Sequence, residues 1–339
     1  MNLFITGNQG YIGSYLTPYL KDKNYKIVGL DSGFFKSNLV SKIKKDYVHK
    51  QINGDIRNLK PVHLEKIDTI IHLCGLSNDP IGKRFEKITD EINYQSSVKL
   101  FKLALKKKVK KFIFASSCSS YGFGGNFART ENSKINPLTS YAKSKVKFEK
   151  FLEKNKNKNI DIIILRFATA CGVSPRLRLD LVLNDFVYSA VKHKKILIKS
   201  NGKPLRPLID VEDMCKIIKW SIHVKQKFFL IVNAGSNINN YSVKEIAMKV
   251  KNIFKHKVQI ELNDKLPDDK RSYRVNFDKL KKNYPNFKPK PLSKTILELI
   301  SLTKKIVLNN KKKANLIRLD YLGKLIKKGK LNNHLIWKK

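Results

Sequence analysis

A tyrosine and a lysine four residues apart are the clearest candidates for proton chemistry in the sequence. Tyr141 and Lys145 lie in the stretch Tyr-Ala-Lys-Ser-Lys, and residues at this spacing share one face of a helix. A lysine ammonium close to a phenol favours the phenolate, so the pair predicts a tyrosine that acts as a base near neutral pH. The spacing alone is weak evidence in a chain this rich in both residue types.

A serine-rich segment supplies the second candidate. Ser117 lies in Phe-Ala-Ser-Ser-Cys-Ser-Ser-Tyr-Gly, which starts at Phe114 inside an apolar run. The carboxyl ends of parallel strands face the ligand crevice of a doubly wound sheet. A hydroxyl there could hold a substrate oxygen while Tyr141 takes its proton. Without Tyr141 and Lys145, the segment would be read equally well as a serine-rich turn.

A glycine-rich turn at the N-terminus predicts a dinucleotide site. The segment Gly-Asn-Gln-Gly-Tyr-Ile-Gly joins an apolar strand to a helical pattern. Glycines permit the tight turn and close approach to a pyrophosphate, and the helix N-terminus offers free N–H groups. The strand–turn–helix context gives weight to a motif that is weak alone. The expected cofactor-binding residues of this turn are Gly7, Gly10, Tyr11, Ile12 and Gly13.

Three later positions extend the cofactor site. Asp31 ends the second apolar run, where a carboxylate accepts hydrogen bonds from ribose hydroxyls and repels a 2′-phosphate, which favours NAD over NADP. Asp55 and Ile56 follow the third strand and could reach the adenine edge. Leu73 closes the fourth strand, where its backbone would line the cofactor trough. His72, beside it, is interpreted as a packed residue.

The elements that must position these groups alternate along the chain. Helical patterns cover 11–20, 91–107 and 141–154, and Pro18 is expected to disturb the first. Strands alternating with helices predict an α/β fold, a doubly wound parallel (Rossmann) sheet. The predicted strands are Leu3 to Thr6, Lys26 to Leu30, Tyr47 to Ile52, Asp68 to Leu73, Lys111 to Ser116, Asp161 to Arg166 and Phe228 to Asn233.

The later chain predicts a smaller, mainly helical substrate-binding lobe. Helices are expected near 175–195, 241–254 and 292–308. We assign residues 1–166 and about 207–236 to the Rossmann domain. Residues of about 167–206 and 237–339 form the lobe. Its basic tail, from Asn309 on, is expected to dock as a helix through one apolar face, made by Ile317, Tyr321, Leu322 and Leu325.

Composition narrows the class of protein. The 339 residues include 42% hydrophobic residues and carry a net charge of +43. Lysines are spread along the whole chain and no nucleic-acid motif accompanies them, so nucleic acid is an unlikely partner. The four scattered cysteines lack metal-ligand spacing, and we expect no metal. No apolar run would span a bilayer and no signal peptide precedes the first strand, so a cytoplasmic enzyme is expected.

Taken together, the chain resembles an extended short-chain dehydrogenase/reductase of the nucleotide-sugar epimerase/dehydratase family, from Met1 to about Leu297. The resemblance implies NAD as cofactor, a nucleotide-sugar substrate and a homodimer. It makes Ser117 and Tyr141 catalytic, with Lys145 holding the nicotinamide ribose and tuning the tyrosine. The parts that carry it, in order, are the glycine turn, Asp31, Asp55-Ile56, His72-Leu73, Asn93, Ser117 with Tyr121-Gly122, and Tyr141 with Lys145.

The resemblance also assigns further binding residues. Asn93 is expected among the cofactor-binding residues. Arg206, in Asn-Gly-Lys-Pro-Leu-Arg-Pro-Leu-Ile-Asp, and Arg271, in Asp-Lys-Arg, resemble arginines that meet the sugar nucleotide. A planar guanidinium suits a diphosphate because it donates two parallel hydrogen bonds. Asn184 is expected at the same substrate pocket, and the segment Ser174 to Arg178 is expected around it.

Departures from the family pattern bear on the reaction. The 4,6-dehydratases and decarboxylases of the family carry an acidic residue just after the catalytic hydroxyl, where this chain has Cys118 and Ser119. A redox-neutral 4-epimerase is therefore favoured. The segment Phe167 to Gly172 lacks an asparagine found in many epimerases, so a dehydrogenase or reductase at one sugar carbon stays open. A non-catalytic relative that binds NAD or nucleic acid is the third possibility.

Overall fold

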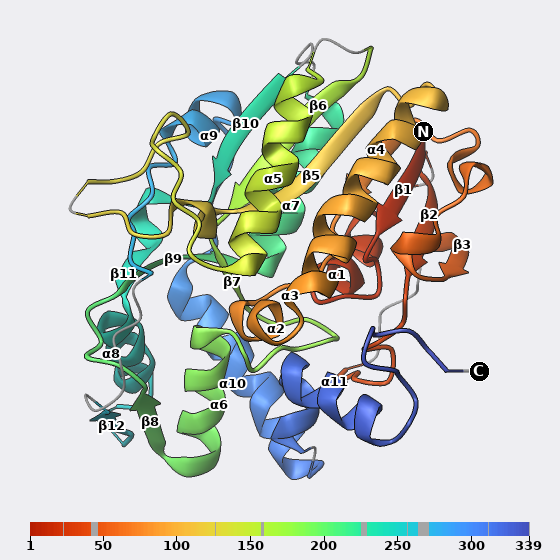
Figure 1. Ribbon diagram of the computed structural model, residues 1–339. Coiled ribbons are helices and arrows are strands. Elements are labelled where there is room, and N and C mark those ends of the chain that lie inside the picture. Colours follow the sequence, from red (N-terminus) through yellow and green to blue (C-terminus); the bar gives the residue numbers. More distant parts are fainter. Residues whose placement is uncertain are drawn as a thin grey trace.

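A parallel sheet forms the centre of the molecule (Figure 1). The computed structural model describes residues 1–22, 24–41, 47–125, 127–156, 159–224, 229–255, 257–263, 271–310 and 312–338. All neighbouring strands of this seven-stranded sheet are parallel. In order across the sheet they are β10 (Phe229–Ala234), β6 (Asp161–Phe167), β5 (Lys111–Ser117), β4 (Thr69–His72), β1 (Asn2–Thr6), β2 (Lys26–Asp31) and β3 (Val48–Asn53).

The strand order reverses between β1 and β4, which pair directly with each other. This is the doubly wound arrangement, and the crevice outside the carboxyl ends of the strands at such a reversal is where ligands bind. The predicted fold class is confirmed, and the strands begin and end within a residue or two of their predicted bounds. Phe228, where the seventh strand was predicted to begin, lies outside the described residues.

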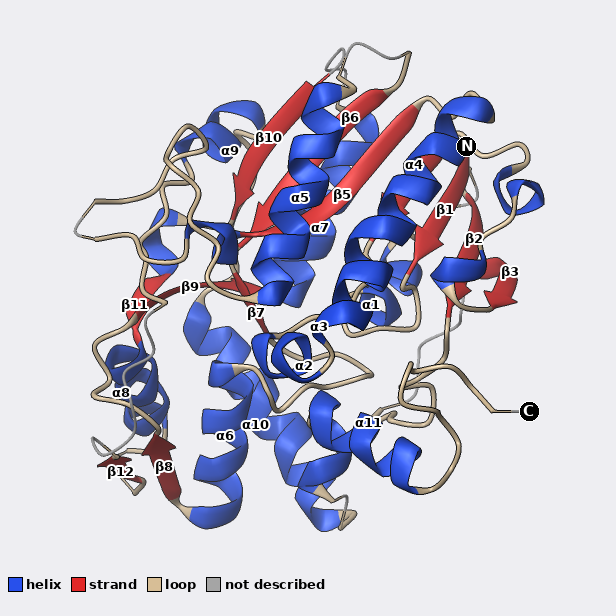
Figure 2. Ribbon diagram, viewed as in Figure 1, coloured by secondary structure: helices blue, strands red, loops and turns tan. Residues whose placement is uncertain are grey.

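Helices cover both faces of the sheet because successive strand side chains point to opposite faces. Phe4 is buried in an apolar cluster with side chains of α4 and α5, whereas Leu3 and Ile5 are buried with those of α1 and α7. Figure 2 shows α4 and α5 in front of the sheet. The flanking helices are α1 (Gly13–Tyr19), α4 (Ser96–Lys106), α5 (Ser140–Lys154) and α7 (Val211–His223).

Short helices fill the connections. A π-helical turn (Glu91–Gln95) opens the helix that the sequence predicted over 91–107, and α4 follows it directly. The short α-helices are α2 (Asp79–Arg84), α3 (Glu86–Asp90) and α9 (Asp278–Asn283). The 3₁₀ turns are η1 (Ile56–Asn58), η2 (Pro61–Leu64), η4 (Cys118–Tyr121), η5 (Asn237–Asn239) and η6 (Lys313–Leu316).

The second lobe lies beyond the carboxyl edge of the sheet (Figure 1) and has its own apolar cluster. Its helices are α6 (Val182–His193), α8 (Val243–Ile253), α10 (Leu292–Leu308) and α11 (Arg318–Lys327). The sequence missed its two small sheets. Their strands, in spatial order, are β11 (Asn240–Ser242), β9 (Leu205–Asp210) and β7 (Thr169–Cys171), and β12 (Gln259–Leu262) beside β8 (Lys195–Ile198).

Three observations bear on the predicted elements and their division. Strand β9 pairs with β7 and β11, although residues from 207 on were assigned to the Rossmann sheet. The predicted helix over 175–195 begins only at Val182. The tail was assigned to the lobe, yet Tyr321, Leu322 and Leu325 are buried in the apolar cluster that contains Phe4. Docking of the tail as a helix agrees with the expectation.

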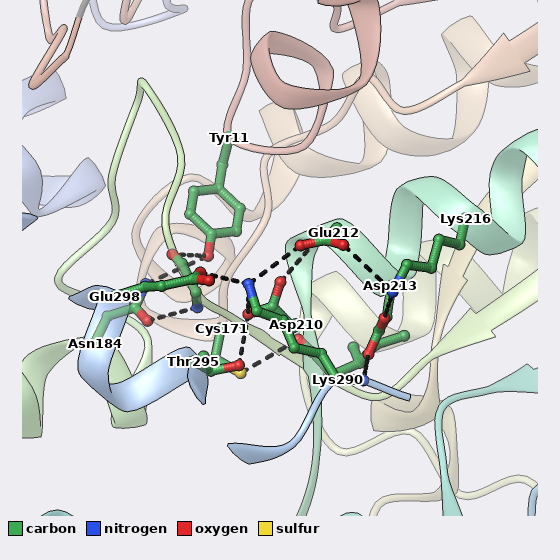
Figure 3. Close-up of polar contacts among 12 residues, drawn as sticks. Tyr11, Cys171, Asn184, Asp210, Glu212, Asp213, Lys216, Lys290, Thr295 and Glu298 are labelled. Atoms are coloured by element: carbon green, nitrogen blue, oxygen red, sulfur yellow. Dashed lines mark hydrogen bonds and ion pairs between the residues drawn. The ribbon is translucent and has the colours of Figure 1, made fainter. Parts of the chain in front are cut away.

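A buried ionic network joins the sheet to the lobe (Figure 3). Lys290, just before α10, places its ammonium 3.6 Å from Asp210 and 3.2 Å from Glu212, at the start of α7. Thr295 of α10 donates a hydrogen bond of 2.7 Å to Asp210. Because breaking a buried pair leaves an uncompensated charge, this network fixes α7 and α10 relative to each other.

Among the described residues, no helix is both long and apolar enough to span a bilayer.

Candidate active site

A cavity of about 680 Å³ lies at the carboxyl edge of the sheet, between the sheet and the second lobe. All predicted site residues except Asn93 and Asn184 line it. These residues are Gly7, Gly10, Tyr11, Ile12, Gly13, Asp31, Asp55, Ile56, Leu73, Ser117, Tyr141, Lys145, Arg206 and Arg271.

The glycine turn has the geometry of a pyrophosphate cradle. Gly7 has φ +74°, and a Cβ there would lie 2.9 Å from the backbone nitrogen of Cys74. A Cβ on Gly13 would overlap the carbonyl oxygen of Gly7. The backbone N–H groups of Tyr11 and Ile12 have no acceptor among the described residues. Free N–H groups at a helix N-terminus suit an anion, so the turn fits the diphosphate of NAD.

The end of β2 and the start of η1 line the part of the cavity where the adenosine of NAD was expected. The Asp31 carboxylate accepts hydrogen bonds from the backbone N–H of Gln9 (3.0 Å) and Gly33 (2.8 Å). Burial raises the pKa of Asp31, and these two hydrogen bonds oppose the shift. Asp55 lines the cavity but accepts three hydrogen bonds from Arg57, of 2.7 to 3.0 Å. Its carboxylate is therefore held by a neighbour at the place where an adenine contact was expected.

The three predicted catalytic residues meet where β5 ends and α5 begins. Ser117 ends β5, and its hydroxyl acts on the phenol of Tyr141, whose pKa it lowers. Lys145 is one turn further along α5 and donates a 2.8 Å hydrogen bond to the carbonyl of Ala115. Burial lowers the pKa of Lys145 to about 8. A hydroxyl, a phenol and an ammonium thus converge on one wall of the cavity, as proton transfer to or from a bound alcohol requires.

The cation that faces the phenol differs from the expectation. Lys145 lies 5.9 Å from the ring centroid of Tyr141, but the charge that lowers the pKa of Tyr141 is the guanidinium of Arg178. Burial of the phenol is stronger and raises that pKa. Arg178 is itself buried and paired with Asp180 at 2.8 Å. The sequence placed Arg178 near the pocket without a role, because an electrostatic interaction with the distant Tyr141 leaves no local pattern.

Two predicted substrate arginines lie together at the far end of the cavity from Asp31. Arg206, on β9, donates hydrogen bonds to the carbonyl oxygens of Leu205 (2.8 Å) and of Arg271. Arg271 pairs with Asp79, at the start of α2. Both arginines act electrostatically on Tyr273, which also lines the cavity. A pair of guanidinium groups suits a diphosphate.

Asn93 and Asn184 support the cavity wall from behind. Asn93 is 1% exposed; its amide accepts from the backbone N–H of Leu76 at 2.8 Å and donates to Ser144 at 3.1 Å. Asn184 is also 1% exposed and bonds to the backbone of Gly172 and Arg178 and to the hydroxyl of Tyr11 (Figure 3). The expectation that these amides contact ligands therefore gives way to a supporting role.

His72 is a packed residue, as interpreted from the sequence. Its ring bonds to the hydroxyls of Thr6 and Ser97, both at 2.7 Å, in a fully buried position. Burial, and secondarily Lys145, lowers the pKa of His72 to about 3. A histidine held neutral in this way anchors β4.

The sequence missed the contribution of the C-terminal tail. Lys313, Ile317 and Arg318 line the cavity, and Arg318 is only 5% exposed. One feature of the sequence could have identified Arg318 as a cavity residue. It is the single arginine in the lysine-rich tail from 309 on, and it lies next to the predicted apolar helix face.

Other chemistry finds little support among the described residues. They contain no group of three or more His, Cys, Asp or Glu side chains that could hold a metal ion. Ser119, at the position where family dehydratases carry an acidic residue, lines the cavity with a buried hydroxyl that has no hydrogen-bond partner in the described structure. Of the two residues directly after Ser117, only Ser119 lines the cavity, and neither is a carboxylate.

Comparisons with known proteins agree with this geometry. The family model described as "NAD dependent epimerase/dehydratase family" matches residues 3–235. The chain is 26% identical over 281 residues to the uncharacterized UDP-glucose epimerase YtcB of Bacillus subtilis, across 78% of this chain and 86% of that protein. It is 26% identical over 298 residues to a putative UDP-glucose 4-epimerase of Methanocaldococcus jannaschii, across 85% and 93%.

Solved structures share the fold. The UDP-glucuronic acid 4-epimerase from Bacillus cereus, in complex with UDP-glucuronic acid and NAD, has a TM-score of 0.79 and 22% identity, with 90% of this chain and 100% of that chain covered. At that identity the likeness shows the fold. The family match spans well over half of the sequence, and the glycine turn and the Ser117, Tyr141 and Lys145 group stand at the edge of the sheet. The chain therefore belongs to the NAD-dependent epimerase/dehydratase family.

Proposed function

We propose that this protein is an NAD-dependent 4-epimerase of a nucleotide sugar. The observation that carries the proposal is the phenol of Tyr141, which lines the same cavity as Ser117, Lys145 and the glycine turn and whose pKa the Ser117 hydroxyl lowers. NAD, when bound, supplies a hydride acceptor and donor for a sugar carbon. The relatives that match most of this chain include proteins named putative UDP-glucose 4-epimerase and UDP-glucose 4-epimerase.

Each residue has a defined task in this scheme. Tyr141 takes the proton of the sugar hydroxyl and later returns it, and Ser117 holds the oxygen and relays the hydrogen bond. Lys145 binds the nicotinamide ribose in this scheme. Arg206 and Arg271 hold the diphosphate of the nucleotide sugar while the sugar turns to offer its other face.

The choice of reaction depends on the two residues directly after Ser117. Cys118 is fully buried and its thiol donates to the carbonyl of Arg166, so it points away from the cavity. Ser119 lines the cavity, and a serine hydroxyl cannot serve as the acid of a dehydration near neutral pH. This favours a reaction that returns the hydride to the same carbon. A dehydrogenase or reductase at a single carbon is the alternative, and the absence of an asparagine between Phe167 and Gly172 keeps it open.

The test is a substrate panel read by NMR. The holoenzyme is incubated with UDP-glucose, UDP-glucuronic acid and UDP-N-acetylglucosamine, without added cofactor. Inversion at C4 of at least one sugar, with the bound cofactor oxidised before and after, is the expected result. Net accumulation of reduced cofactor in step with an oxidised sugar would replace the epimerase with a dehydrogenase. Retention on nucleic acid without turnover of any nucleotide sugar would favour the non-catalytic alternative.

We further propose a cytoplasmic homodimer. The four cysteines are all unpaired in the structure, which suits a reducing compartment. Light scattering on the purified protein measures the oligomeric state; a mass of 39.1 kDa would mean a monomer and would overturn the dimer.

A further inference from the structure

The C-terminal segment, residues 312–338, lies across the adenosine half of the cavity. Figure 1 shows α11 beneath the carboxyl ends of the strands, with the chain then running back towards β3. The indole N–H of Trp337 donates to the carbonyl of Ser32 at 2.7 Å, and the hydroxyls of Tyr321 and Ser37 bond at 2.6 Å. Arg57 donates to the carbonyl oxygens of His334 and Leu335. The segment therefore holds the loop after β2 and the turn after β3.

Arg318, the first residue of α11, is carried into the cavity by this segment. Its guanidinium lies 3.7 Å from the ring centroid of Phe35 and is 5% exposed. It makes no hydrogen bond or ion pair with any described residue. Burial, with Arg178 next, lowers the pKa of Arg318 to about 9. A buried cation with free donors and too little opposing charge is costly unless a ligand supplies that charge.

Arg318 lines the same cavity as Asp31, Arg178 and the glycine turn. Asp31 and Asp180 both act on it electrostatically. Asp31 marks the adenosine ribose end, and Asp180 is paired with Arg178, which faces Tyr141 at the reacting end. Between these two ends lies the glycine turn with the free N–H groups of Tyr11 and Ile12.

We propose that Arg318 binds the diphosphate of the dinucleotide, opposite the glycine turn, so that the C-terminal segment is part of the cofactor site. Five N–H donors in a planar fork match two phosphate oxygens. The glycine turn would contact the diphosphate from the sheet side and Arg318 from the lobe side. The proposal rests on the NAD site of the family and adds a residue outside the matched region, 3–235.

The diphosphate of the nucleotide sugar is the other source of the same chemistry. Arg206 and Arg271 already stand at that end of the cavity, beside Tyr273. Arg318 instead packs on Phe35, in the loop that follows the ribose carboxylate Asp31. This position favours the dinucleotide.

The experiment compares ligand affinities of Arg318→Gln with those of the parent protein, after any co-purified dinucleotide has been removed. Calorimetry gives the Kd of four probes: NAD, ADP, adenosine and UDP. Lys327→Gln, which removes a positive charge from an exposed position of the same helix, is the matched control. We expect NAD and ADP to bind about 10- to 100-fold more weakly to Arg318→Gln, the range for lost hydrogen bonds to a charged group. Adenosine, UDP and all four Kd values of the control should stay within twofold.

Each other outcome overturns the proposal. Unchanged NAD and ADP affinity means that the guanidinium does not reach the diphosphate. A loss for UDP alone assigns Arg318 to the substrate, and an equal loss for adenosine assigns it to the nucleoside. Because these are binding measurements, failure of the epimerase assay leaves them unaffected.

A structural role is separated by the stability of the unliganded protein. Arg318 gives up no hydrogen bond to a described residue, so the Tm of Arg318→Gln without ligand should be no lower than that of the parent. Arg318→Lys keeps the charge without the fork and should recover part of the lost NAD and ADP affinity. A lower unliganded Tm together with equal losses for all four probes, none of it recovered by lysine, would show that the residue only supports the fold.

Discussion

Glu149→Gln should destabilise the protein strongly, because it breaks a buried ion pair behind the active site. Glu149 lies one helical turn after Lys145 on α5, and Arg166 lies near the end of β6 next to it. The guanidinium and carboxylate meet at 2.7 Å with side chains only 3% and 4% exposed. Ser116 also donates to this carboxylate. Glutamine keeps the size of the side chain and removes the charge, so the Arg166 guanidinium is left buried without a counter-ion.

The expected loss is about 3–5 kcal/mol in the free energy of unfolding, the range for removal of one partner from a buried pair. Urea denaturation followed by circular dichroism measures it. Glu153→Gln, one turn further along α5 and exposed, is the control and should change stability by less than about 0.5 kcal/mol. The double variant Glu149→Gln, Arg166→Gln should lose less than the sum of the single losses, since both break the same interaction.

A second readout connects this pair to catalysis. Burial lowers the pKa of Lys145, and the Glu149 charge is one of the influences that raise it. Removing that charge should lower the Lys145 pKa further, so the alkaline limb of kcat/KM should move to lower pH. A stability of Glu149→Gln within about 1 kcal/mol of the parent would refute the burial argument.

The remaining predictions concern the cofactor, the acid/base and acid stability. Tyr141→Phe should lower kcat by about 10²- to 10⁴-fold, as expected for loss of a general acid/base, with the Kd for NAD within twofold by calorimetry; full activity would remove Tyr141 from the mechanism. Asp31→Ala should weaken the binding of NAD by about 10- to 100-fold, because hydrogen bonds to a charged group are lost, and should weaken the binding of NADP less. An unchanged ratio of the two Kd values would refute the ribose role. His72 has a folded-state pKa of about 3 against an ordinary value of 6.5, so only the unfolded chain takes up this proton as pH falls below about 6.5. The parent should therefore lose stability towards pH 4 more steeply than His72→Gln, and parallel pH profiles of unfolding free energy would contradict the neutral histidine.

The sheet was predictable because its determinants are local. Each central strand is a short apolar run such as Ile162 to Leu165, buried on both faces, and helical periodicity fills the gaps between runs. The small strands were not predicted, because a segment of three or four residues such as Thr169–Cys171 is too short for its hydrophobic periodicity to distinguish a strand from a loop. Helix α6 starts late for a related reason: Arg178 and Asp180 are held by side-chain contacts across the cavity, which override helical propensity.

The site was predictable where a motif is contiguous. The glycine turn and the pair Tyr141 and Lys145 fix their own geometry within a few residues. Arg178 and Arg318 reach the cavity from segments far along the chain, and only the folded structure brings them to it. Asn93 was expected at the cofactor, but it lies in a π-helical turn behind the wall, where it bonds with Leu76 and Ser144. A resemblance to a family shows that such a residue occurs in the sequence, but it does not predict the direction in which its amide points.

Burial of Leu322 and Leu335 in the same apolar cluster as Phe4 has a consequence for dissecting the molecule. A fragment that stops where the family match stops, near residue 235, would uncover the patch that these leucines fill. Each fully buried leucine is worth about 1.5–3 kcal/mol, a large share of the marginal stability of a domain. The nucleotide-binding half is thus not an autonomous folding unit, and its first strand depends on residues from the opposite end of the chain.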